Sequence, residues 1–214
     1  MEEKTNFLES IYYPLIFLAV IWGIKFAEIL TGLNLGILGI FPRQVSGLTG
    51  VIFAPLLHGS LFHLFSNSGP VLILGTTLFY FYRDVAFRVI LFSWLITGFG
   101  VWLAGREAYH IGASGLIYTI ASFLFFSGFI RRSIELIAIS FIVVFLYGGM
   151  VWGIFPLREG VSWESHLTGA AAGTALAFAY MRHGPQRKKY NWEYEDEHEE
   201  GDDTGGINDE GGIN

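Results

Sequence analysis

Long runs of apolar residues, separated by short polar breaks, dominate the chain. A helix of about 20 mostly apolar residues crosses a bilayer core about 30 Å thick. Six windows reach that length, at 11–30, 61–82, 85–104, 113–130, 133–155 and 163–181. Charged pairs such as Arg83-Asp84 and Arg131-Arg132 separate them. The pattern predicts an all-α fold, a polytopic membrane helix bundle of six transmembrane helices.

The stretch 31–60 is also apolar, but glycines and prolines interrupt it repeatedly. None of its uninterrupted pieces is long enough to cross a bilayer. Irregular backbone at membrane depth persists only where protein or a wet cavity satisfies its polar groups. We therefore expect a long, ordered first loop that packs on the bundle at the outer interface.

Basic residues in the short loops predict the orientation, because they are enriched on the cytoplasmic side. With both termini cytoplasmic, nine Lys and Arg residues fall in inside loops or termini, and only Arg43, Arg106 and Arg158 fall outside. The nine are Lys4, Arg83, Arg88, Arg131, Arg132, Arg182, Arg187, Lys188 and Lys189. This bias predicts a multi-pass protein of the cell (plasma or inner) membrane with cytoplasmic N- and C-termini.

Charge is concentrated at the C-terminus, where 10 of the 19 acidic residues lie between Glu193 and Glu210. The net charge of −6 therefore belongs to the tail, and the balanced body gives no reason to expect nucleic-acid binding. We predict a short cytoplasmic N-terminus (1–10), a six-span domain (11–183) and a disordered, acidic cytoplasmic tail (184–214). The chain has no cysteine, which excludes disulfides and thiolate chemistry.

Two polar residues lie where a membrane helix is otherwise apolar. His63 and Asn67 are four residues apart, which places both on one face of the span 61–82 near its outer end. Such side chains often only join helices by hydrogen bonds, whereas an ionisable residue inside a membrane is otherwise a functional candidate. His58, at the junction of loop and helix, is by itself typical of an interfacial residue.

Ser114 opens the fourth window, in the sequence Gly112-Ala113-Ser114-Gly115. Serine is a favoured helix N-cap, which is sufficient reason for finding it there. The functional alternative is a nucleophile. The flanking glycines would admit a substrate backbone, and the free N–H groups of a helix N-terminus would stabilise an oxyanion. This short motif alone does not decide between the two.

His166 lies near the outer end of the sixth window and is followed by Gly169-x-x-x-Gly173. The histidine by itself is equally explained as a packing residue. The two glycines, with three alanines between them, form a seam of small residues that lets another helix approach closely. Close approach is what a nucleophile and a base on different helices require.

The predicted topology brings Ser114, His166, His63 and Asn67 to the same outer depth, although the chain separates them widely. A nucleophile, a base and two donors to an oxyanion are the minimum set for acyl transfer. The combination therefore favours an acyl-transfer enzyme.

Taken in order, these motifs resemble the rhomboid family of intramembrane serine proteases. The resemblance covers nearly all of residues 10–183. Its motifs are His58-x-x-x-x-His63-x-x-x-Asn67, Gly112-x-Ser114-Gly115 and His166-x-x-Gly169-x-x-x-Gly173. It implies that Ser114 is the nucleophile and His166 the general base. It also implies that His63, Asn67 and the Ser114 backbone N–H form the oxyanion hole, and that Tyr118 stacks on the histidine.

Family members often carry a Trp-Arg pair in the first loop, which here has no Trp, so only Arg43 is available to stand in. The resemblance implies cleavage of single-span or multi-span membrane proteins in or beside the lipid bilayer, with no metal or organic cofactor. It does not indicate an oligomeric state.

Water must reach Ser114, so we expect polar outer loops and His58 to line a wet cavity. Glu164, two residues before His166, should point elsewhere on a helix.

Other functional classes are open to the same sequence. A catalytically inactive relative that binds transmembrane clients would have the same fold, but both residues of the dyad are present here. A small transporter could also use six spans with intramembrane His and Asn, yet it predicts internal repeats, and we find none. An intramembrane metalloprotease would need a His-Glu-x-x-His helix, which the sequence lacks.

Overall fold

The structure is a computed structural model that describes residues 7–131, 134–146, 152–157 and 160–184. These residues form helices and loops without a strand, which confirms the predicted all-α class for the described part. The elements are α1 (Phe7–Thr31), η1 (Leu35–Leu38), η2 (Val45–Leu48), α2 (Thr49–Phe53), η3 (Ala54–Leu56), α3 (Leu61–Phe81), α4 (Ala86–Ala104), α5 (Ser114–Arg131), α6 (Ile134–Leu146) and α8 (Trp163–Ala179).

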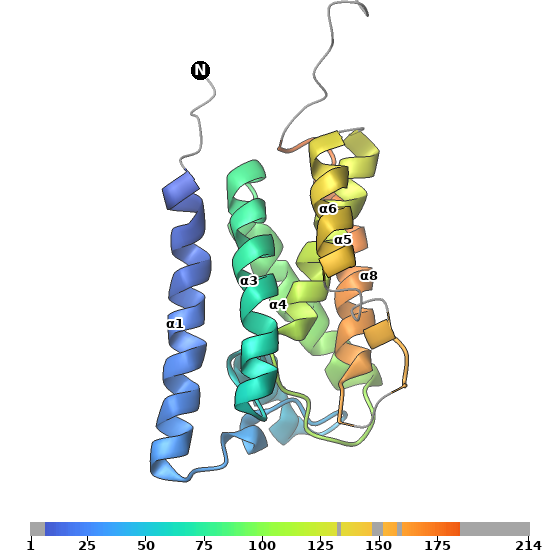
Figure 1. Ribbon diagram of the computed structural model, residues 1–214. Coiled ribbons are helices and arrows are strands. Elements are labelled where there is room, and N and C mark those ends of the chain that lie inside the picture. The colour runs from blue at the N-terminus through green and yellow to red at the C-terminus, as the bar shows by residue number, and fades with distance from the viewer. Residues whose placement is uncertain (1–6, 132–133, 147–151, 158–159, 185–214) are drawn as a thin grey trace, which may run out of the picture.

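The long helices stand side by side, and α1, α3, α4 and α5 alternate in direction along the chain (Figure 1). One end of the bundle gathers the end of α1, the starts of α3, α5 and α8, and the loops 32–60 and 105–113. We call it the loop end. The start of α1 and the end of α8 lie at the opposite end.

Local sequence explains where two of the helices begin and end. The Ser60 hydroxyl accepts a hydrogen bond from the His63 backbone N–H at 3.0 Å, which caps the start of α3. α1 stops at Gly32, whose φ of +67° is a left-handed conformation that glycine adopts without steric cost. Both boundaries lie at the loop end and fix where the long segment 32–60 leaves and rejoins the bundle.

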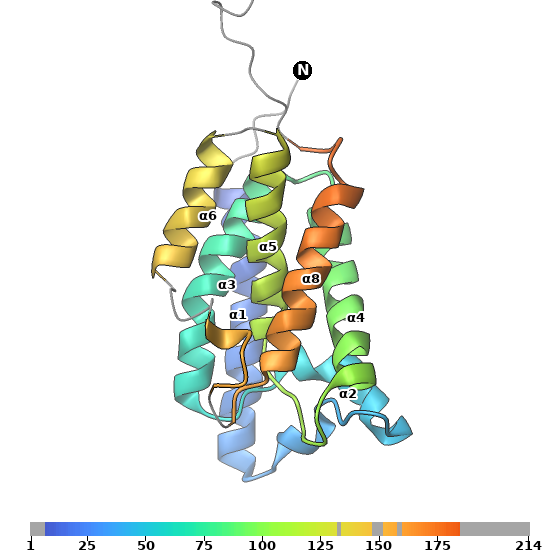
Figure 2. The same ribbon diagram turned by 90° about the vertical axis from the view of Figure 1, so that its right-hand side faces the viewer.

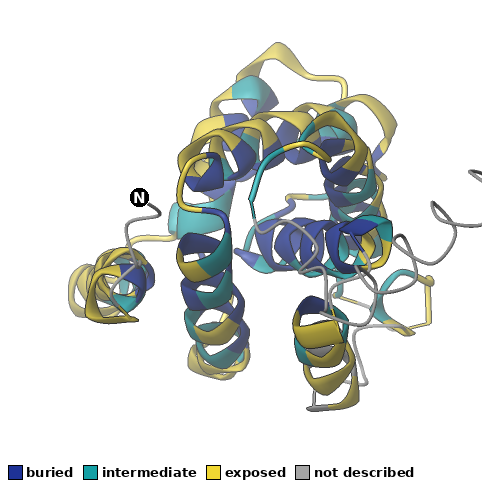
Figure 3. Ribbon diagram, turned by 90° about the horizontal axis from the view of Figure 1, so that it is seen from above, coloured by how far each residue is buried: buried dark blue, intermediate teal, exposed yellow. Residues whose placement is uncertain are grey.

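Helix α5 is the centre of the bundle and packs against α3, α4, α6 and α8. Its Phe123 and Leu124 are fully buried, together with Leu78 and Tyr82 at the end of α3. By contrast α1 stands at the edge and buries only Ser10, Pro14 and Ile21, so most of its surface is exposed (Figure 3). α5 is therefore held from several sides, whereas α1 depends on contacts along one face.

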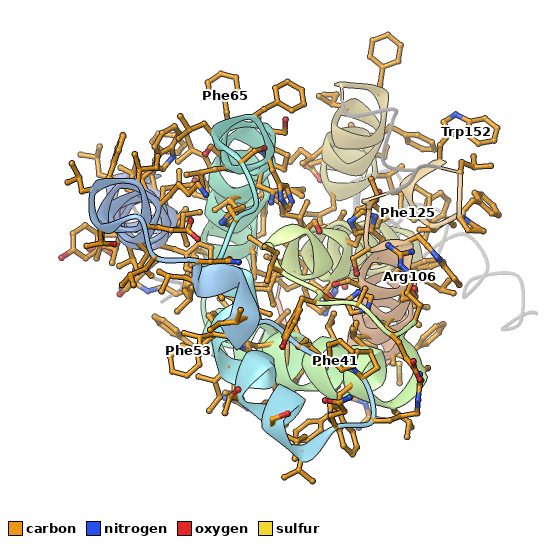
Figure 4. The ribbon with its side chains drawn as sticks, turned by 90° about the horizontal axis from the view of Figure 1, so that it is seen from below. Phe41, Phe53, Phe65, Arg106, Phe125 and Trp152 are labelled. Carbon is orange, nitrogen blue, oxygen red and sulfur yellow. The ribbon has the colours of Figure 1, made fainter. Side chains whose placement is uncertain are left out.

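The segment 32–60 folds over the loop end of α4, and Phe41 and Phe53 lie with it (Figure 4). Indole N–H groups of α4 fasten it: Trp94 donates to the Val51 carbonyl and Trp102 to the Gln44 carbonyl, each at 2.8 Å. Arg43 completes the attachment by donating from Nη1 to the Gly105 carbonyl at 2.8 Å. Two tryptophans of α4 and one arginine of the loop therefore anchor this segment.

Four helices, α1, α3, α4 and α5, are long and apolar enough to cross a membrane. The described part of α6 has 13 residues and α8 has 17. The fifth predicted span, 133–155, includes residues outside the described part, so the number of six spans stays a prediction. α1 begins at Phe7, earlier than the predicted boundary at residue 11.

The predicted disordered tail lies outside the described residues, apart from Gly184. So do several basic residues on which the predicted orientation depends: Lys4, Arg132, Arg158, Arg187, Lys188 and Lys189. The orientation accordingly stays a prediction.

Candidate active site

Ser114 and His166 meet at the loop end of the bundle. Ser114 is the first residue of α5, and His166 lies in the first turn of α8. Nε2 of His166 lies 2.8 Å from Oγ of Ser114, so the two side chains form a hydrogen bond between helices. Residues that the chain separates widely are thus brought into direct contact.

The other ring nitrogen of His166, Nδ1, lies 2.8 Å from the Gly153 carbonyl oxygen. A carbonyl only accepts, so Nδ1 carries the proton and the Nε2 lone pair faces the Ser114 hydroxyl. Tyr118 stacks on the imidazole with ring centroids 4.2 Å apart and planes within 7° of parallel. A Cβ on Gly153 would collide with the Tyr118 hydroxyl. These contacts hold the imidazole in one tautomer and one plane.

The close packing of α5 on α8 depends on small residues (Figure 2). A Cβ on Gly169 would collide with the Gly115 carbonyl, and one on Gly173 with the Thr119 carbonyl. Gly115 has no room for a side chain either, since its Cβ would lie 2.7 Å from Thr97 Cγ2 of α4. The glycines of the predicted seam therefore face α5, the helix that begins with Ser114.

The turn before Ser114 packs against α3. Gly112 has a φ of +119°, which strongly favours glycine. A Cβ there would lie 2.7 Å from His63 Cε1 and 3.8 Å from Asn67 Nδ2. The predicted residues of α3 therefore lie beside the turn that presents Ser114.

His58 lies beneath this turn and is only 3% exposed. Its Nε2 is 3.1 Å from Asn67 Nδ2 and 3.4 Å from the Ala113 backbone nitrogen. Both neighbours are N–H donors, so Nε2 is the acceptor. The expectation that His58 lines a wet cavity is wrong, because its ring is buried against Asn67 and Ala113 and does not contribute to the lining of the cavity over Ser114. Its enclosed ring instead connects the Asn67 amide to the residue before Ser114.

Burial lowers the pKa of His58 from 6.5 to about 4, and the neighbouring His63 lowers it further. The ring is therefore neutral near pH 7 and keeps the Nε2 lone pair that its two donors require. Protonation would remove this acceptor and turn both contacts into repulsions between donors.

The pKa of His58 makes folding depend on pH. The unfolded histidine gains its proton below 6.5 and the folded one only near pH 4. The contribution of His58 to the free energy of unfolding is therefore complete above about pH 6.5 and is lost as the pH falls toward about 4. At 1.36 kcal/mol per pKa unit the loss is about 3 kcal/mol. We expect the thermal midpoint in detergent to fall more steeply with acidification in the wild type than in His58→Gln. Equal slopes would contradict this assignment.

A cavity of about 930 Å³ opens over the dyad. Ser114, His166, His63, Asn67 and Tyr118 all contribute to its lining. Arg106 and Trp152 lie on its α8 side (Figure 4), and polar side chains such as Ser60, Ser66 and Ser162 also line it. Among the described residues no group of three or more His, Cys, Asp or Glu could hold a metal ion.

Glu164 is 4% exposed and bonds to the loop 105–113 rather than to His166. Its carboxylate accepts from the Arg106 backbone N–H at 3.3 Å and from Arg106 Nη1 at 3.4 Å. His110 Nδ1 of the same loop lies 2.6 Å from the Ser162 hydroxyl. These contacts join the loop before Ser114 to the start of α8.

Sequence reasoning missed several residues that hold the site together. Arg106 and His110 are polar residues of a polar loop, so nothing in the hydrophobic pattern distinguishes them. Gly153 acts through its backbone carbonyl, which leaves no signature of residue type. Gly153 lies within the fifth predicted window, 133–155, where nothing in the sequence distinguishes it as a partner of His166.

The model of the Rhomboid domain matches residues 45–183 of the chain. The chain belongs to the rhomboid family. Uncharacterized proteins of Mycobacterium tuberculosis and Mycobacterium bovis are each 40% identical over 186 residues, covering 81% of this chain and 75% of the relative. One of Mycobacterium leprae is 34% identical over 184 residues, covering 81% and 72%.

Membership of the rhomboid family confirms the resemblance found in the sequence motifs. Together with four helices long and apolar enough to cross a membrane, it identifies an integral membrane protein. Helix α1 precedes the matched region, which starts within the first loop.

Proposed function

We propose that this rhomboid protein is an intramembrane serine endopeptidase with Ser114 as nucleophile and His166 as general base. The observation that carries the proposal is the 2.8 Å contact between Ser114 Oγ and His166 Nε2. This distance is within the hydrogen-bond reach that a nucleophile and its base require. The Nδ1 proton is engaged by Gly153, so the Nε2 lone pair is free to accept the serine proton.

In the proposed mechanism, Nε2 of His166 takes the hydroxyl proton as Ser114 Oγ attacks a peptide carbonyl. The new C–O bond gives a tetrahedral oxyanion beside an imidazolium. The imidazolium then protonates the leaving amine while the C–N bond breaks, which leaves an acyl-enzyme. Water enters from the cavity, gives its proton to His166, and hydrolyses the ester to release the acid and restore Ser114.

The oxyanion would be held by donors from two helices. Asn67 Nδ2 carries two N–H groups, and with one directed to His58 the other remains for the oxyanion. His63 lies against the same turn, and the Ser114 backbone N–H is one of the free donors at the start of α5. Donors fixed before the reaction stabilise developing charge without reorganisation.

Replacing Asn67 with alanine should lower the cleavage rate by about 10²–10³-fold, the usual loss when one oxyanion donor is removed. The loss should fall on kcat, because the donor acts mainly on charge that develops in the transition state. The measurement is steady-state cleavage of a single-span substrate in detergent. An unchanged kcat would return Asn67 to the role of joining helices.

The substrates are membrane proteins, either single-span or multi-span. The predicted excess of Lys and Arg on the cytoplasmic side would put the loop end, and with it the cavity, on the outer side of the membrane. A helix in lipid keeps its carbonyls hydrogen-bonded, so the scissile segment must unwind to reach Ser114. Segments weakened by Gly or Pro near the outer boundary should therefore be preferred.

The test is to incubate the purified protein in detergent with a single-span substrate, with and without a serine-directed fluorophosphonate. We expect cleavage that the reagent blocks and covalent labelling of the protein. Binding of the substrate without cleavage or labelling would contradict the proposal and favour an inactive client-binding protein.

A further inference from the structure

Two charged residues, Lys25 and Glu28, lie near the loop end of α1, after a long apolar run of that helix. Their side chains are only 12% and 16% exposed, and Lys25 Nζ lies 2.6 Å from Glu28 Oε2. Ionisable residues within a membrane helix are costly and indicate a functional role. We call this pair the α1 clasp. It lies outside the region that the Rhomboid domain matches.

The α1 clasp holds both ends of the segment 32–60. Lys25 Nζ donates a second hydrogen bond to the His58 carbonyl at 2.9 Å. Glu28 Oε1 accepts one from the Leu35 backbone N–H at 3.0 Å. A single ion pair therefore fixes the place where the first loop leaves α1 and the place where it enters α3.

His58 is the residue through which this attachment reaches the site. Lys25 holds its backbone, and its ring accepts from Asn67 and lies near the Ala113 backbone N–H. A displacement of the His58 backbone would move the ring and, with it, the Asn67 amide. A misplacement of about 1 Å at a reacting site can cost about 100-fold in rate.

We propose that Lys25 is a positioning residue of the oxyanion hole, acting through the His58 backbone on the Asn67 side chain. The inference rests on the proposed peptidase function. Hydrogen bonds from a charged donor are about twice as strong as neutral ones, which suits a contact that must hold a loop in place. Glu28 supplies the counter-charge that makes the lysine tolerable at this depth.

The alternative is that the α1 clasp only attaches α1 to the bundle. The chain offers a matched control for this, because Glu9 and Arg83 form an ion pair between α1 and the turn after α3 at the opposite end. Glu9→Gln removes an attachment of α1 far from the site. If attachment alone matters, Glu9→Gln and Lys25→Met should have similar effects.

We expect Lys25→Met to lower kcat by between about 10- and 100-fold with KM unchanged, measured on the monodisperse, folded fraction. Lys25→Arg, which keeps a charged donor, should recover most of the loss, and Glu9→Gln should keep the wild-type kcat. If Lys25→Met yields no folded protein, Glu28→Gln replaces it, with a smaller loss of kcat expected. An unchanged kcat in the folded variant would overturn the inference.

A double mutant isolates the route of action. In an Asn67→Ala background, Lys25→Met should lower kcat no further, because the group that it positions is gone. Losses that simply multiply would overturn the inference. A wild-type protein without Ser114-dependent cleavage would instead refute the proposed function, so the two failures are distinguishable.

Discussion

Replacing Ser114 with alanine is expected to abolish both cleavage and fluorophosphonate labelling. Removal of the nucleophile of a serine protease lowers kcat by about 10⁶-fold, which is below detection for a membrane substrate in detergent. The fold should survive, because a serine at a helix start contributes at most about 1–2 kcal/mol as a cap. The measurements are product formation on gels, labelling, and the yield of monodisperse protein.

The matched control is Ser66→Ala, which removes another hydroxyl from the lining of the same cavity. It should keep both cleavage and labelling. If Ser114→Ala cleaves at a rate near that of the wild type, the assignment of this chain as a serine peptidase is wrong.

Replacing Gly173 with leucine is expected to reduce cleavage and labelling to the level of Ser114→Ala, although neither residue of the dyad changes. A Cβ at this position already collides with the Thr119 carbonyl, which is backbone and cannot turn away. α8 must therefore move off α5. The 2.8 Å contact between His166 and Ser114 spans these two helices and would be lost.

Gly23→Leu is the control for adding a large side chain to a membrane helix. Gly23 lies in α1 with no neighbour within 4 Å of its Cβ position, so a leucine there meets open space. It should leave cleavage unchanged. Wild-type cleavage by folded Gly173→Leu would show that the dyad tolerates separation of α5 and α8.

The elements that the sequence predicted best are those set by local patterns. The window 61–82 corresponds closely to α3 (Leu61–Phe81), because a long apolar run ends at charged residues and begins at a serine cap. The meeting of Ser114 and His166 was also predictable, since the predicted topology places both at the same depth and the small residues after His166 favour a close helix contact. For α3 the deciding signal lies within a few residues, whereas for Ser114 and His166 the order of the spans is needed as well.

The parts that could not be predicted depend on how the first loop folds. His58 stands at a junction that looks interfacial in sequence, yet it is buried, with its ring against Asn67 and Ala113. Lys25 is a lone cation in an apolar helix, and only the folded loop brings the His58 carbonyl to it. Contacts to backbone atoms, including the Gly153 carbonyl, carry no signature of residue type.

The Gly153 carbonyl gives the imidazole of His166 a neutral dipole where a triad protease supplies a carboxylate. In the proposed mechanism the imidazolium therefore forms without a full counter-charge, and the barrier to acylation stays correspondingly high. If acylation is slow in this proposed mechanism, a client helix that leaves the cavity quickly would escape uncut. Discrimination among clients would then depend on how long each one dwells over Ser114, so that residence time, rather than a tight recognition sequence, would be the selecting quantity.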